Sequence, residues 1–131
     1  MSSIGPRFWI ALGSASAMIS VAMGAFGAHA LSQRLDPRSL EVFKTGAQYQ
    51  MTHSLALIAF GLWASLFSAR TPEGAAPSLP GWLFVAGILL FSGSLYALTL
   101  SGVRALGIIT PFGGVAFMAG WLVFAWLAWR G

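Results

Sequence analysis

The chain has 131 residues, of which 57% are hydrophobic and 8% charged, with a formal net charge of +4 and no cysteine. Soluble domains carry about 25% charged residues, so this composition excludes an ordinary water-soluble domain and favours an integral membrane protein. The absence of cysteine excludes disulfides, thiolate metal sites and cysteine nucleophiles. The few basic residues are spread over the ends of apolar segments and form no stripe that could bind nucleic acid.

The first apolar segment, about residues 8–31, contains no charged residue and is long enough to cross the hydrocarbon core of a membrane. Small residues recur along it at four-residue spacing, which would let a neighbouring helix approach closely. We expect this row to pack against another helix. Its members are Ser16, Ser20, Gly24 and Ala28.

Residues 37–45 are predicted to form a short amphipathic helix on the membrane surface, between the first and second spans. Asp36 is a typical N-cap residue, and Pro37 suits the first helical position because it has no amide proton to leave unpaired. The pattern leaves open whether this helix continues into the second span or bends at Gly46.

The second and third spans are predicted at about residues 47–69 and 82–101. The segment between them, residues 70–81, holds three of the six prolines and is expected to be an exposed loop. On the third span, Gly93 and Ala97 predict a second row for close helix packing.

Two assignments compete for the fourth span. It could cover residues 105–129 with a kink at Pro111, or it could cover residues 111–129 with Thr110 as its N-cap. We favour the second assignment, because Thr-Pro is good capping chemistry and 19 residues still extend about 28 Å.

The predicted fold is therefore all-α: a single membrane domain over residues 1–131, built as an up-down bundle of four helices. In such a bundle the end of the first span, the start of the second, the end of the third and the start of the fourth lie in one membrane half. The candidate ligand-binding residues all fall in that half. They are His29, Tyr49, Gln50, His53, Tyr96 and Arg104, accompanied by Ser94, Thr99 and Thr110. All six tryptophans fall in the other half.

This polar cluster has several interpretations. Buried polar side chains commonly hold membrane helices together by hydrogen bonds. The cluster could instead form a pocket for a lipid headgroup or another ligand, with Arg104 or Lys44 as the partner of an anion. His29 and His53 could act as axial ligands of a haem, although two histidines are a weak signal. We expect no cofactor, no metal site and no catalytic residues, because no carboxylate lies inside a span to support such chemistry.

Four motifs in order resemble a family of small four-span membrane proteins known only as a domain of unknown function. They are Gly24-Ala-Phe-Gly-Ala-His-Ala-Leu31, residues 43–57, Phe91-Ser-Gly-Ser-Leu-Tyr96 and Ile109-Thr-Pro-Phe-Gly-Gly114. The match extends from about residue 8 to 128, and the family is similar to a small mitochondrial transmembrane protein of animals. The resemblance supports the four-span fold and implies no catalytic residue. Ala30 stands where the family pattern suggests glycine.

We therefore expect a non-enzymatic accessory, scaffold or assembly component, with lipid or small hydrophobic ligand binding as the alternative. The expected partners are membrane lipids and, beyond these, further copies of the chain or a larger membrane complex. The expected location is a bacterial inner membrane. The predicted polar half has four basic residues near its span ends and the other half three, so the positive-inside rule predicts that both termini lie outside the cytoplasm.

Overall fold

The computed structural model describes residues 4–71, 74 and 76–131, and within them every regular element is a helix. Four helical stretches are long and apolar enough to cross a membrane, which confirms the predicted all-α membrane bundle. In chain order, the elements are α1 (Pro6–Phe26), π-helix η1 (Gly27–Leu31), α2 (Pro37–Arg70), α3 (Leu79–Gly87), π-helix η2 (Ile88–Ser92), α4 (Gly93–Ser101), 3₁₀ helix η3 (Arg104–Ile108) and α5 (Thr110–Arg130).

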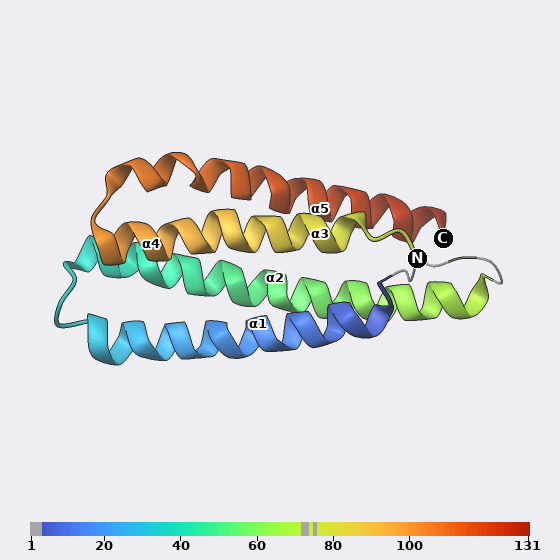
Figure 1. Cartoon of the computed structure of the whole chain (residues 1–131), viewed down its shortest axis with the longest axis horizontal. Helices are drawn as coiled ribbons and strands as arrows, with labels where there is room; N and C mark the ends of the chain where they lie inside the picture. The colour runs from blue at the N-terminus through green and yellow to red at the C-terminus, as the bar shows by residue number, and fades with distance from the viewer. Residues whose placement is uncertain (1–3, 72–73, 75) are drawn as a thin grey trace.

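The spans lie side by side with their axes nearly parallel, and both ends of the described chain lie at the same end of the bundle (Figure 1). The helix α1 packs along α2, while α5 packs along α3 and η2. These two hairpins are joined through contacts of α2 with α3, η2 and α4. We call the end formed by residues 32–36 and 102–104 the loop end, and the opposite end the terminal end.

The predicted surface helix at residues 37–45 is the beginning of α2, which continues without interruption to Arg70. Asp36 caps this helix as expected, because its carboxylate accepts a 2.7 Å hydrogen bond from the backbone N–H of Ser39. Gly46 does not bend the helix. It is buried beneath Tyr96, whose Cε1 would lie 2.9 Å from a Cβ at that position. At 34 residues, α2 is about 51 Å long and exceeds the hydrocarbon core of a membrane.

The close-packed face of α1 differs from the predicted row. Ser16 and Ser20 do contact α2, but a Cβ on Gly24 would meet nothing within 4 Å, and Ala28 is exposed. Four-residue steps drift about 40° per step around a helix, whereas seven-residue steps drift only about 20°. The actual contact row therefore has seven-residue spacing: Gly13, Ser20 and Gly27.

The third span was also assigned the wrong packing row, because Gly93 has only its own helix near it and Ala97 is exposed. Its close contacts with α5 are made elsewhere. Phe117 of α5 covers Gly87, and Phe84 of α3 covers Gly120 in return. A Cβ on Gly113 would overlap the backbone of Phe91, so α5 approaches closest where the third span adopts the π-helix η2.

The helix α5 begins at Thr110, close to the favoured assignment, but the apolar stretch long enough to cross a membrane also includes η3 and covers Arg104–Arg130, close to the alternative assignment. The capping role of Thr110 was wrong, since no side-chain cap bond is present at the start of α5. Its hydroxyl instead forms a 2.6 Å hydrogen bond with Ser94 of α4. Of the predicted loop 70–81, residues 72–73 and 75 lie outside the described part. The expectation of an exposed loop is wrong at its end, because α3 begins at Leu79 and both Pro80 and Gly81 are buried.

Candidate functional site

Gln50 connects three of the four spans from a buried position on α2. Its amide nitrogen donates to the carbonyl oxygen of Ser16 at 3.1 Å and lies 3.2 Å from the Ser16 hydroxyl, both on α1. Its amide oxygen accepts a 2.6 Å hydrogen bond from the hydroxyl of Tyr96 on α4. The side chain is only 5% exposed, and both ends of its amide form hydrogen bonds with neighbouring helices.

Serine hydroxyls extend this network along the α1–α2 contact. Ser54 is fully buried, and its hydroxyl lies 2.7 Å from the Ser16 hydroxyl and 2.6 Å from the backbone carbonyl oxygen of Gln50. One turn closer to the loop end, Ser20 donates a 2.6 Å hydrogen bond to the carbonyl oxygen of Ala47. Because hydrocarbon offers no other partners, these bonds satisfy groups that would otherwise be costly to bury.

His53 uses both ring nitrogens inside the bundle. The indole N–H of Trp121 on α5 points at Nε2 at 3.0 Å, and Nδ1 lies 2.8 Å from the carbonyl oxygen of Tyr49. An indole N–H can only donate, so Nε2 must be the acceptor and Nδ1 must carry the proton that is donated to Tyr49. The geometry therefore assigns a neutral imidazole of defined tautomer.

Aromatic rings hold this imidazole in place. The ring of Phe117 stacks on His53 with centroids 3.5 Å apart and planes inclined by 9°. Tyr49 packs against Phe91 at 4.6 Å and is itself 43% exposed, so it covers the cluster from the lipid side. The arrangement resembles a packed core with a polar centre.

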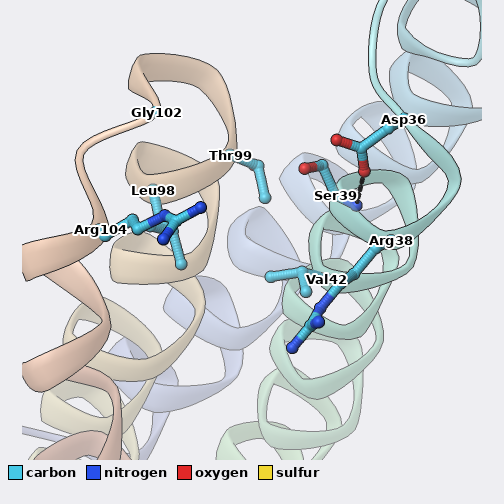
Figure 2. A pocket seen from close by; sticks show the side chains of 8 residues that line it. All are labelled: Asp36, Arg38, Ser39, Val42, Leu98, Thr99, Gly102 and Arg104. Carbon is cyan, nitrogen blue, oxygen red and sulfur yellow. Dashed lines mark hydrogen bonds between the residues drawn. The ribbon is translucent and has the colours of Figure 1, made fainter.

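The structure brings together four of the six predicted cluster residues and separates the other two. Tyr49, Gln50, His53 and Tyr96 lie within one polar and aromatic region. His29 is exposed in η1, whereas His53 is buried, so the structure does not bring these two histidines together. Arg104 is exposed in η3 and lies on a separate pocket at the loop end (Figure 2).

Trp121 is the partner that the sequence pattern missed. Its position was assigned to the half opposite the polar residues, yet it lies 11 residues into α5 and thus about 16 Å along that helix, near the middle of α5. His53 lies about 24 Å along α2, and only the hydrogen bond between the two side chains shows that they meet. Because the two helix distances differ, counting residues from each helix start does not predict this pairing. Among the described residues, no group of three or more His, Cys, Asp or Glu side chains could hold a metal ion.

These features define an integral membrane four-helix protein whose interior polar residues link neighbouring spans. The chain belongs to the family described as protein of unknown function DUF423, whose model matches residues 23–114. It is 43% identical over 118 residues to the UPF0382 membrane protein YwdK of Bacillus subtilis, covering 89% of this chain and 92% of that protein.

A UPF0382 membrane protein of Haemophilus influenzae is 42% identical over 118 residues, which cover 90% of both chains. No solved structure matches the chain significantly. These relatives are bacterial membrane proteins, and the similarity to an animal mitochondrial protein stays a prediction.

Proposed function

We propose that this protein is a non-enzymatic accessory, scaffold or assembly component of a bacterial inner membrane. The observation that carries the proposal is the use of the buried polar groups: Gln50 binds Ser16 and Tyr96, and His53 binds Trp121. A catalytic or ligand site needs donors and acceptors directed at a reacting or bound molecule. Here the corresponding groups are directed at neighbouring helices.

The same bonds support a rigid platform. Interhelical hydrogen bonds in a membrane contribute about 0.6 kcal/mol on average, and they specify which helix faces lie together. A platform of this kind acts through its outer surface. The lipid-facing side of α5 is strongly apolar, and its most exposed large side chains are Phe112, Val115, Met118, Leu122 and Trp129.

Site-specific photo-crosslinking in living cells tests the proposal. A photoreactive phenylalanine analogue is placed at Met118 or Leu122 on the outer side of α5, or at Met18 on the outer side of α1. We expect a discrete higher-mass protein adduct from at least one outward position, either with a second copy or with another membrane protein. The matched control is the buried Phe60, which should give no intermolecular adduct. The absence of any crosslinked protein adduct at all of the outward positions would contradict an assembly role.

A second candidate function, binding of a lipid or small hydrophobic molecule, is favoured by a lateral groove of about 210 Å³. Its walls are apolar side chains of α1, α2 and the third span, including Ile19, Leu57 and Leu89, while Ser16 and Gln50 contribute polar atoms. Native mass spectrometry of protein extracted from its own membrane tests this candidate. A retained molecule of constant mass that is lost in Ile19→Trp would support it, and retention unaffected by this substitution would argue against the groove.

A further inference from the structure

A pocket of about 590 Å³ lies at the loop end, between the start of α2 and the junction of α4 with η3. Arg38 in the first turn of α2 and Arg104 in η3 stand on opposite walls. Figure 2 shows the Arg104 side chain extending from η3 toward α2, whereas the Arg38 side chain runs along the start of α2 beside Val42. The remaining lining residues are Asp36, Ser39, Val42, Leu98, Thr99 and Gly102.

The charge of this pocket favours an anion. Its lining carries two guanidinium groups and one carboxylate, a net charge of +1. The carboxylate of Asp36 is committed to the start of α2, because it accepts the backbone N–H of Ser39 at 2.7 Å. Guanidinium groups, by contrast, offer several N–H donors in a planar fork that matches phosphate oxygens.

The surroundings of the pocket indicate where such an anion comes from. Exposed apolar side chains flank Arg104 on both sides in sequence: Leu100 and Val103 precede it, and Ile108 and Ile109 follow it. Val42 and Leu98 add apolar surface inside the pocket. Cationic and apolar groups occur together in this way at the boundary between lipid headgroups and acyl chains.

We propose that this pocket binds the phosphate group of an anionic membrane phospholipid, held between Arg38 and Arg104. The acyl chains of that lipid would follow the exposed apolar residues around η3. The pocket volume lies within the range of about 300–1,000 Å³ that is typical of small-molecule sites and accommodates a glycerophosphate headgroup. The inference goes beyond the accessory role and does not depend on it.

The test uses the full-length protein and native mass spectrometry from detergent micelles supplemented with either phosphatidylglycerol or phosphatidylcholine of identical acyl chains. Arg38→Gln and Arg104→Gln each remove one wall charge. Arg130→Gln is the matched control, because it removes an exposed arginine at the terminal end. Circular dichroism verifies that all variants are folded. In a separate arm, inorganic phosphate is added to the wild-type complex at millimolar concentration.

We expect phosphatidylglycerol to be retained in preference to phosphatidylcholine, with retention reduced about fivefold by each pocket substitution and unchanged by Arg130→Gln. Equal retention of the two lipids would overturn the proposal. An equal loss of phosphatidylglycerol retention in Arg130→Gln would also overturn the proposal, because such a loss would indicate general charge attraction. Displacement of the lipid by inorganic phosphate would identify a site for free phosphate and would overturn the assignment to a membrane lipid.

Discussion

The indole N–H of Trp121 donates a 3.0 Å hydrogen bond to Nε2 of His53 and thereby connects α5 to α2 inside the bundle. Trp121→Phe removes the donor and leaves Nε2 without a partner in a buried region. We expect a loss of about 0.6–1.7 kcal/mol in the free energy of unfolding, the range seen for interhelical hydrogen bonds in membranes. Thermal and chemical unfolding in detergent measure it, with the highly exposed Trp129→Phe as the control.

The same bond predicts the tautomer of His53. In protein labelled with ¹⁵N histidine, Nδ1 should carry the proton and Nε2 should appear as an unprotonated acceptor. Nitrogen NMR spectra of the wild type and Trp121→Phe report this directly. A proton on Nε2 in the wild type would contradict the assigned hydrogen bond.

Gln50 and Tyr96 should be energetically coupled because a 2.6 Å hydrogen bond joins them across α2 and α4. Tyr96→Phe removes one bond, whereas Gln50→Leu also breaks the contact with Ser16 and should cost more stability. A double-mutant cycle should give a coupling free energy of about 1 kcal/mol. Additive effects of the two substitutions would show that this hydrogen bond contributes nothing to stability.

Two glycines of α1 provide a matched pair for helix packing. A Cβ on Gly13 would lie 2.7 Å from the backbone oxygen of Ser54, whereas a Cβ on Gly24 would be free of contacts. Gly13→Ala should therefore destabilise the protein by about 1–3 kcal/mol through overpacking. Gly24→Ala should change the free energy of unfolding by no more than about 0.5 kcal/mol, because no neighbouring atom obstructs the added Cβ. Equal effects in thermal unfolding would refute the seven-residue contact row.

The start of α2 should weaken in acid. The backbone N–H of Ser39 beside the Asp36 carboxylate lowers the pKa of Asp36 in the folded protein. The charged form is favoured by folding, so its contribution is complete above the unfolded pKa of about 3.9 and is lost as the pH falls through the lower folded pKa. Asp36→Asn keeps a capping oxygen and should remove this part of the acid dependence of unfolding. Asp36→Ala should lower stability at neutral pH as well.

Both termini should lie on the same side of the membrane, and the positive-inside rule predicts the outer side. A C-terminal alkaline phosphatase fusion should be active, and the matching fluorescent-protein fusion should be dark. The reverse pattern would place both termini in the cytoplasm and the pocket of Arg38 and Arg104 at the opposite leaflet.

The sequence by itself determined the membrane class, the four spans and the cap at Asp36. These features depend on local composition, run length and residues a few positions apart, all of which can be counted along the chain. It also brought Gln50, His53 and Tyr96 into one membrane half, because alternating span directions determine approximate depth.

Only the tertiary structure decided which side chains face one another. The direction of a side chain around its helix depends on the rotation of the whole helix against its neighbours. A four-residue pattern and a seven-residue pattern of small residues look alike over two turns and then diverge. For that reason the contact is formed by Gly13 and Gly27 and not by the predicted Gly24 and Ala28, and His29 is exposed. The pairing of His53 with Trp121 arises in the same way, from two residues that are 68 positions apart in the chain and whose side chains meet inside the bundle.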